Sequence, residues 1–381
     1  MLHLNDLPLE ILANITEFLS TRSILNLAVC CKYFHDILFI VKFNDRIDFE
    51  HISEISYFNS FTNVWYKQFG SSFPKSLQSL FWNCNNEMPS DLPPSLKSLR
   101  LSNHYDYPLP RFPDSLESLD LGHAFNQPLS YLQSSLKYFR LSYYYDQLLP
   151  PLPDSIESLD LGPHYNEYLP RMPDSLKILR LGDCYNKTLP TFPTCLKSLR
   201  LGDHYNETLP QFPDSFEYLE LGYHYNQPLQ LPDSLRSLKL GNDYNQLLSH
   251  IPSSLKCLKL GYNYIHPLPQ LPDSLESLHL GHFYNQALLQ LPASLKYLRL
   301  SYNYDQALPQ LPDSLEILKI NNHYNQPLSQ LPASLKRLHL GYFYDHLLPQ
   351  FPNSLTHLKI WSKFVLPKSL SPKIIVEYFD K

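Results

Sequence analysis

The chain has 381 residues, of which 43% are hydrophobic, and its formal net charge at pH 7 is −5. A chain of this length can bury a large core, and its net acidity makes it a poor candidate for a nucleic-acid-binding protein. It contains no run of 18 apolar residues and no basic, apolar leader at its start, so we expect no membrane-spanning helix, no signal peptide and no membrane partner.

The first forty residues predict a small helical unit. Leu7, Ile11, Ile15 and Leu19 recur at helical spacing, and a second amphipathic stretch follows over residues 23–38. A unit of this size has more apolar side chains than it can bury alone. We therefore expect it to pack against a partner or against the rest of the chain.

Residues 1–42 resemble the F-box along nearly the whole length of that motif. The matching positions are Leu7, Pro8, Glu10, Ile11, Leu12, Ile15, Phe18, Leu19, Leu25, Leu27, Val29, Cys30 and Phe34, whereas Cys31 stands where the family usually has a basic residue. The resemblance implies an all-α module that binds the Skp-type adaptor of an SCF ubiquitin ligase and, through it, a cullin. The implied adaptor-binding residues are Leu7, Pro8, Ile11, Ile15, Leu25, Val29 and Cys30. The alternative is a helical cap on the repeats that follow.

Residues 43–73 have no clear period. We interpret them as a linker and N-terminal cap built from degenerate first rungs, among which are Trp65 and Tyr66. A solenoid needs such a cap because its end would otherwise expose the core.

Residues 74–360 repeat a block of 20 residues fifteen times. Each block contains L-x-x-L-x-L, as at Leu116, Leu119 and Leu121, and the final alternation predicts one short strand with leucines pointing inward. The regular period predicts a solenoid whose strands stack as a parallel sheet at about 4.8 Å per rung. Recurrent prolines predict extended or polyproline return limbs, and a recurrent Gly after the strand indicates positive φ or a close backbone approach.

An Asn or Asp column runs through the same repeats, directly after an aromatic residue. Examples are Tyr205–Asn206 and Tyr225–Asn226, and between residues 105 and 345 the column is interrupted only by Ile265. We expect a buried ladder that satisfies backbone groups of the loops, rather than a ligand site.

The repeats resemble the FNIP repeat, whose tetrad stands as FNQP at residues 125–128 and as YNQP at 225–228 and 324–327. With the F-box, the chain resembles F-box and FNIP-repeat proteins of amoebae and giant viruses, and its repeats are similar to the short leucine-rich repeats of bacterial effectors. The resemblance implies a small all-α F-box module followed by a leucine-rich-repeat-like β-solenoid. Residues 361–381 are interpreted as a C-terminal cap, with a final strand within 372–379 that closes the stack.

Charge is sorted onto the predicted strand face. The solvent-facing position four residues after the first leucine is charged or His in fourteen successive repeats, and its sign alternates from Arg100 to Asp160. That alternation predicts a self-neutralising ladder. Further along, basic residues follow one another on neighbouring rungs, which implies an acidic or phosphorylated target protein, with a merely solvated face as the alternative. The predicted target-binding residues are Lys177, Arg180, Lys197, Arg200, Tyr218, Arg236, Lys239, Lys256 and Lys259.

No pattern predicts catalysis, a cofactor or a metal. Ser and Asp belong to the turn columns, and no glycine-rich phosphate loop occurs. His164, Cys184, His204 and His224 share one column on four rungs, but at about 4.8 Å per rung they span roughly 14 Å and cannot all bind one zinc ion.

The six cysteines form no C-x-x-C pair, which is typical of reduced thiols in an intracellular protein, cytoplasmic or nuclear, and in the host cell if the protein is viral. We therefore expect a non-enzymatic substrate receptor of an SCF-type ligase. The alternatives are a decoy that occupies the adaptor, or a protein-binding scaffold with no link to ubiquitin.

Overall fold

The structure is a computed structural model that describes residues 23–24, 43, 47–48, 58–66, 73–84, 86–362 and 373–379. The chain forms two compact units, Met1–Leu176 and Lys177–Lys381. Between residues 58 and 379, the described segments contain strands, turns and extended backbone, with one short 3-10 helix. No helix in these ranges has the length and hydropathy needed to span a membrane. The predicted F-box helices over residues 1–42 lie almost entirely outside the described residues.

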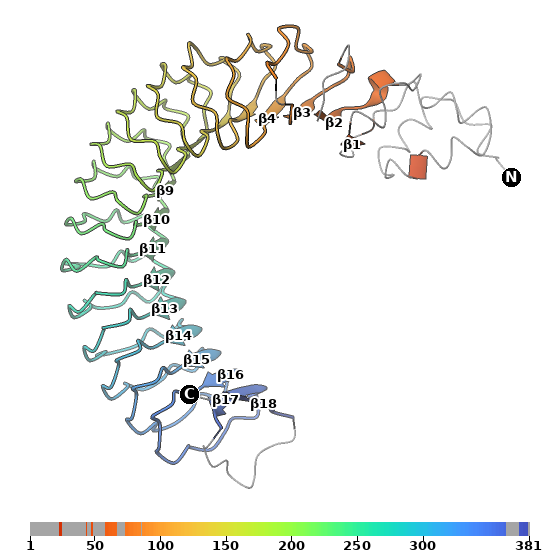
Figure 1. Ribbon diagram of the computed structural model, residues 1–381. Coiled ribbons are helices and arrows are strands. Elements are labelled where there is room, and N and C mark those ends of the chain that lie inside the picture. Colours follow the sequence, from red (N-terminus) through yellow and green to blue (C-terminus); the bar gives the residue numbers. More distant parts are fainter. Residues whose placement is uncertain are drawn as a thin grey trace, which may run out of the picture. The chain divides into compact units, whose positions relative to one another are not determined.

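The elements of the first unit are β1 (Ile47–Asp48), η4 (Phe58–Ser60), β2 (Asn63–Tyr66), β3 (Ser79–Trp82), β4 (Ser98–Leu101), β5 (Ser118–Asp120), β6 (Tyr138–Arg140) and β7 (Ser158–Asp160). Those of the second unit are β8 (Ile178–Arg180), β9 (Ser198–Arg200), β10 (Tyr218–Glu220), β11 (Ser237–Lys239), β12 (Cys257–Lys259), β13 (Ser277–His279), β14 (Tyr297–Arg299), β15 (Ile317–Lys319), β16 (Arg337–His339), β17 (His357–Trp361) and β18 (Ile375–Phe379). Figure 1 shows that within each unit the strands lie along one side of the stack and the return limbs along the other.

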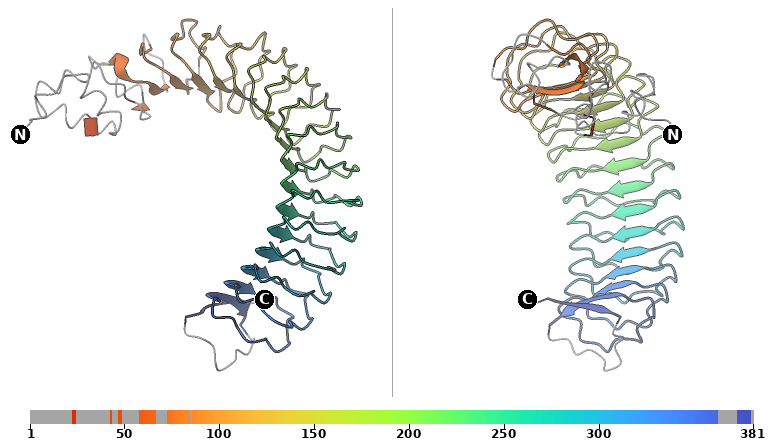
Figure 2. Two further views of the ribbon diagram at one scale, coloured as in Figure 1. Left: turned by 180° about the vertical axis from the view of Figure 1, so that it is seen from behind. Right: turned by 90° about the vertical axis from the view of Figure 1, so that its right-hand side faces the viewer.

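Consecutive strands within each unit pair in parallel, and each leucine lies beside the leucine of the next rung. Leu99 on β4 pairs with Leu119 on β5, and Leu238 on β11 pairs with Leu258 on β12. Figure 2 shows the strands of the second unit stacked in this way. The predicted solenoid is confirmed. Near its ends, β2 pairs with β3 and β18 pairs with β17, while the division into caps stays a prediction.

The leucines of each repeat form the core, as their alternation predicts. Leu116, Leu119 and Leu121 are buried, whereas Ser118 and Asp120 on the same strand are partly accessible. A fully buried leucine contributes roughly 1.5–3 kcal/mol, so one rung gains little alone and the solenoid depends on repetition.

The serine that recurs before each strand has a structural role beyond the turn that the sequence pattern predicted. The Ser135 hydroxyl donates to the Leu116 carbonyl at 2.6 Å, and Ser254 donates to Leu235 at 2.7 Å. Each serine thus ties the start of its own strand to the start of the preceding one. These bonds satisfy carbonyl groups that lie beyond the short ladder of the sheet.

The Asn/Asp ladder forms as predicted, but it is not buried. The backbone N–H of Asn226 donates to Asn206 Oδ1 at 2.8 Å, and the backbone N–H of Asn245 donates to Asn226 Oδ1 at 2.9 Å. Asn206 is exposed and Asn226 is half-buried. The ladder therefore satisfies backbone groups at the outer edge of the loop, while the aromatic residue before each Asn fills the interior.

The spacing of the buried aromatic rings shows how each unit bends. Phe125 and Tyr145 in the first unit are parallel within 1° with centroids 6.2 Å apart, and Tyr205 and Tyr225 in the second unit are parallel within 6° at 6.1 Å. Because these rings occupy the same position in successive repeats, their separation is the displacement of one rung at that point. Strands in a sheet lie only about 4.8 Å apart. Each unit by itself is therefore narrower on the strand side, which makes the sheet its concave face.

The recurrent glycine serves a close approach between rungs. A Cβ on Gly202 would lie 1.7 Å from the carbonyl oxygen of Gly182, which no side chain can occupy. Among the described glycines, positive φ occurs at Gly122 alone, at 70°. Of the two uses that the sequence indicated, close packing is the general one.

Candidate functional site

The outward side chains of the strands form an array of charge along each unit. In the first unit this array is neutralised, as the alternating signs predict. Arg100 lies 3.5 Å from Asp120, and Arg140 lies 3.8 Å from both Asp120 and Asp160. Such exposed pairs are worth about 0–1 kcal/mol each.

In the second unit, glutamates on neighbouring rungs neutralise most of the predicted target-binding residues. These ion pairs are Lys197–Glu217 at 3.6 Å, Arg236–Glu217 at 3.5 Å, Arg200–Glu220 at 3.9 Å, Lys256–Glu276 at 3.5 Å, and Lys239–Glu220. Of the remaining predicted residues, Tyr218 is 48% exposed. Arg180 lies beside Arg200 in the parallel pairing of β8 and β9, and Lys177 directly precedes β8. That this set binds a target stays a prediction.

Beyond Lys239 the outer column of the second unit changes character, because it contains no acidic residue until Glu377 on β18. Parallel pairing places its members side by side in the order Lys259, His279, Arg299, Lys319, His339 and Lys359, and we call this set the basic column. Lys359 pairs with Glu377 at 3.7 Å. Within the described part of the chain, no carboxylate forms an ion pair with Lys259, Arg299 or Lys319.

Sequence reasoning included Lys259 in the predicted surface and missed the rest of the basic column. The available signal was the lack of any Asp or Glu at this repeat position after Glu220. The prediction was based instead on pairs of basic residues on adjacent rungs, and most of those residues form ion pairs in the structure.

Two shallow depressions lie along the basic column. The first, of about 300 Å³, is lined by Lys259, Tyr262, His279, His282, Arg299 and Tyr302, together with Asn242, Asn321 and Asn322. The second, of about 610 Å³, includes Arg299, Lys319, Arg337, His339 and Lys359. Arg299 lines both depressions and therefore stands between them.

Aromatic rings stack against the basic column and hold its side chains. The His279 ring lies 4.5 Å from that of Tyr297, with 17° between their planes, and Lys319 Nζ lies 5.5 Å from the centre of the Tyr297 ring. Beside the column, His282 is stacked between Tyr262 and Tyr302 at 4.2 Å and 4.7 Å. These contacts restrict the side chains that line the first depression.

Both histidines of the basic column are neutral at pH 7. Burial lowers the pKa of His279 to about 4, and the positive charges of its neighbours act in the same direction. Those neighbours are Lys259 on β12, Arg299 on β14 and Lys319 on β15. Burial and then Lys359, Lys319 and Arg299 lower the pKa of His339 to about 4 in the same way. A neutral imidazole retains one donor and one acceptor nitrogen.

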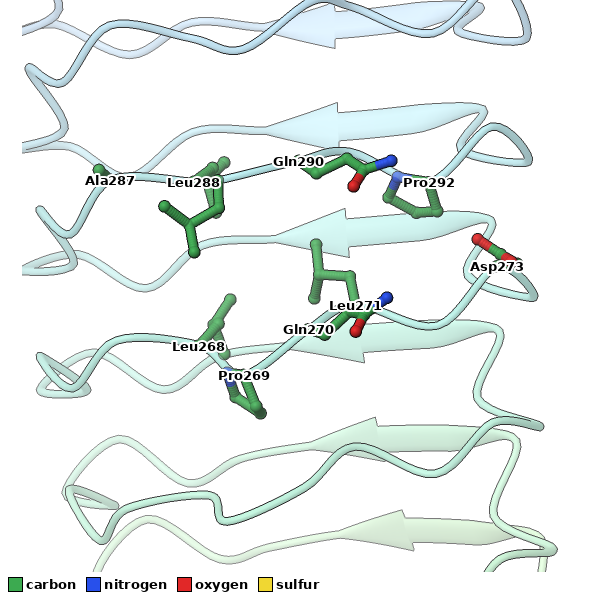
Figure 3. Close-up of a pocket in the computed structure, with 10 residues that line it drawn as sticks. Leu268, Pro269, Gln270, Leu271, Asp273, Ala287, Leu288, Gln290 and Pro292 are labelled. Atoms are coloured by element: carbon green, nitrogen blue, oxygen red, sulfur yellow. The ribbon is translucent and has the colours of Figure 1, made fainter.

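A hollow of about 320 Å³ also lies on the return-limb side of the second unit. Figure 3 shows Leu268 and Pro269 on one limb and Ala287 and Leu288 on the next. A similar hollow of about 900 Å³ lies between residues 208–214 and 228–234. Because its lining recurs with the repeat, we regard this hollow as part of the solenoid's architecture, and the basic column as the stronger candidate site.

The column of possible metal ligands does not gather into a cluster. In the second unit, the His204 and His224 rings lie 5.5 Å apart, and His224 Nδ1 is 2.7 Å from Asp243 Oδ2. Across the described residues, no group of three or more His, Cys, Asp or Glu side chains could hold a metal ion. The predicted adaptor-binding residues Leu7, Pro8, Ile11, Ile15, Leu25, Val29 and Cys30 lie outside the described ranges.

Comparison with known families identifies both parts of the chain. The FNIP repeat matches residues 82–123 and, in overlapping copies, residues 185–363. An F-box-like segment matches residues 4–46. Among curated proteins, no significant match is found.

Comparison with solved structures identifies leucine-rich-repeat solenoids. YopM from Yersinia enterocolitica WA-314 is 22% identical with a TM-score of 0.58, and the match covers 84% of this chain and 86% of YopM. CroV588, described as a novel circular LRR protein, is 23% identical over 85% of this chain and 76% of its own, with a TM-score of 0.36. The likeness to YopM shows a shared parallel β-solenoid of the leucine-rich-repeat type.

Proposed function

Since this chain belongs to the family of FNIP-repeat proteins and carries an F-box-like segment at residues 4–46, we propose that it is the substrate-recognition subunit of an SCF-type E3 ubiquitin ligase. In this role the F-box binds a Skp-type adaptor, which links the chain to a cullin, and the solenoid binds a target protein. The observation that carries the proposal is the presence of both segments in one chain.

The F-box half of the proposal gives a reason for the apolar residues near the start of the chain. Leu7, Pro8 and Ile11 fall within the matched segment, at positions that the F-box resemblance assigns to the adaptor. A short helical unit with this many apolar residues gains stability when a partner covers them.

The solenoid half rests on the strand face of the repeats. Parallel rungs hold outward side chains at fixed spacing, and a curved solenoid offers an extended concave surface for a partner. The face carries charge, aromatic rings and shallow depressions, all of which suit protein binding. Ubiquitin transfer itself would belong to other subunits, and this chain would contribute proximity and orientation.

A pull-down with a purified Skp-type adaptor tests the proposal. Wild-type chain should capture the adaptor, and a variant combining Leu7→Asp with Pro8→Ala should not, because a buried charge replaces an apolar contact. Leu7→Met serves as the matched control, since it keeps the residue apolar and should retain binding. Circular dichroism must show that all three chains fold. Absence of binding by the folded wild-type chain would refute the ubiquitin link and leave a protein-binding scaffold.

Reconstitution with a cullin, a ubiquitin-conjugating enzyme and cell extract then separates a receptor from a decoy. A receptor should cause ubiquitin to appear on at least one captured protein, in a manner that requires the intact F-box. Adaptor binding without transfer to any captured protein would favour the decoy.

A further inference from the structure

We propose that the basic column binds a phosphorylated segment of the target protein, with a phosphate seated between Lys259 and Arg299 in the first depression and His279 taking up a proton as it binds. The inference deepens the solenoid half of the proposed function and rests on it for the identification of the partner as a target protein. The binding event itself does not depend on the F-box.

Uncompensated charge is the first observation in favour of this site. Along the rest of the outer column, cations pair with carboxylates, as Arg200 does with Glu220. Lys259, Arg299 and Lys319 form no such pair among the described residues. The nearest glutamate column also provides no compensation, because Glu276 binds Lys256 at 3.5 Å and Lys296 at 2.8 Å. Three unpaired cations on a concave face attract a polyanion.

The groups that line the first depression match a phosphate in number and kind. A phosphate monoester presents three strong acceptor oxygens and close to two negative charges. Arg299 offers a planar fork of N–H donors, Lys259 offers an ammonium group, and the polar residues Asn242 and Asn322 also line the depression. A carboxylate has fewer acceptor sites and half the charge, so the phosphate is the better match.

His279 lies between the two cations that would hold the phosphate. The register places Lys259 on one side of it and Arg299 on the other, and Tyr297 stacks on its ring. Burial and the flanking cations keep it neutral, with a pKa of about 4. A phosphate dianion opposes both cations, so its arrival raises the pKa of His279 and favours a protonated imidazole with two donors.

The stacked rings distinguish this surface from one that binds single-stranded nucleic acid. Sites of that kind stack bases on exposed aromatic faces. Here both faces of His282 are covered, by Tyr262 and by Tyr302, and one face of Tyr297 is covered by His279. These contacts stiffen the depression, and its lysine and arginine suit a phosphate on an extended peptide.

Fluorescence anisotropy with the full chain tests the site. The probe is a fluorescein-labelled peptide with two phosphoserines in a Gly-Ala background, compared with the same peptide without phosphate and with a labelled oligo-dT. We expect saturable binding of the phosphopeptide that inorganic phosphate displaces. Arg299→Gln should weaken it at least about tenfold, as should Lys259→Gln, because each removes a charge-assisted hydrogen bond.

Lys336→Gln is the matched control, because it removes one positive charge from the same face outside the depression. It should change the affinity by less than about twofold, as expected for an exposed ion pair with Glu316. Equal losses in all three variants would mean general charge attraction and would overturn the site. Equal binding of the unphosphorylated peptide would do the same. Tighter binding of oligo-dT that is lost in Arg299→Gln would reassign the surface to nucleic acid.

Calorimetry in buffers of different ionisation enthalpy measures how many protons the complex takes up when the phosphopeptide binds. Phosphopeptide binding at pH 7 should take up more protons in the wild-type chain than in His279→Gln, which should still bind, though more weakly. Equal proton uptake by the two chains would overturn the role of His279. Since none of these measurements uses the adaptor, a failed adaptor pull-down and a failed phosphopeptide titration refute different claims.

Discussion

Replacing Asn226 with alanine tests whether the Asn/Asp ladder stabilises the solenoid. Asn226 Oδ1 accepts the backbone N–H of Asn245 at 2.9 Å and the side-chain amide of Gln246 at 3.3 Å. Asn226→Ala removes both bonds and leaves a half-buried N–H without its acceptor. At roughly 0.5–1.5 kcal/mol per bond, the free energy of unfolding should fall by about 1–2 kcal/mol.

Asn226→Asp provides the control, because Asp already fills this role elsewhere: Asp305 Oδ1 accepts the Asn325 amide at 2.8 Å. Urea denaturation should show a lower midpoint for alanine and almost no change for aspartate. Because repeat arrays need not unfold in a single step, amide exchange at Asn245 should be measured as well, and it should quicken in the alanine variant alone. Equal destabilisation by both substitutions, or by neither, would refute the proposed role of the ladder.

Three further outcomes follow from the structure. Ile265→Asn should raise the free energy of unfolding by up to about 1 kcal/mol in urea denaturation, because the Asn285 N–H has no acceptor among the described residues and the new side chain would supply one; a lower stability would contradict this. Gly202→Ala should lower it by about 2 kcal/mol or more, since its Cβ would meet a backbone oxygen at 1.7 Å; an unchanged denaturation midpoint would refute the close packing. His279 has a folded pKa of about 4, below its ordinary 6.5, so the unfolded chain binds more protons between these values and the melting temperature should fall as pH drops from about 6.5 to 4, less steeply in His279→Gln; equal slopes would contradict the burial of a neutral ring.

The fold was predictable because every level of the repeat points to the same answer. The alternation at Leu119 and Leu121 specifies the inner face, and the constant period brings the same position of each repeat into register. The burial of the Asn/Asp ladder was predicted wrongly because a column of amides says which backbone groups it can satisfy, but not how far from the core the loop lies. Asn206 is exposed because the preceding Tyr205 fills the interior and moves the ladder outward.

The charged face was less predictable, because pairing depends on the reach of side chains between rungs. Sequence reasoning compared signs within a column and found that the lysines and arginines before residue 259 repel one another. In the structure, Glu217 lies between Lys197 and Arg236 and binds both, so a single acidic rung neutralises its two neighbours. The charges of a repeat sequence therefore have to be compared over three rungs at a time. Basic residues stay unpaired only where no acidic residue lies on either neighbouring rung.

The two histidines explain how the basic column can persist in a folded solenoid. Two exposed cations on adjacent rungs, about 4.8 Å apart, repel by roughly 0.9 kcal/mol in water, and this falls to about 0.4 kcal/mol at two rungs. His279, neutral at pH 7, separates Lys259 from Arg299 by two rungs and so lowers the repulsion between them. Acidic residues that alternate with basic ones, as between Arg100 and Asp160, would remove this repulsion entirely, but they would also neutralise the surface. A neutral imidazole reduces the cost while the site is empty and can acquire a proton when an anion arrives, which is the combination that a phosphate-binding surface requires.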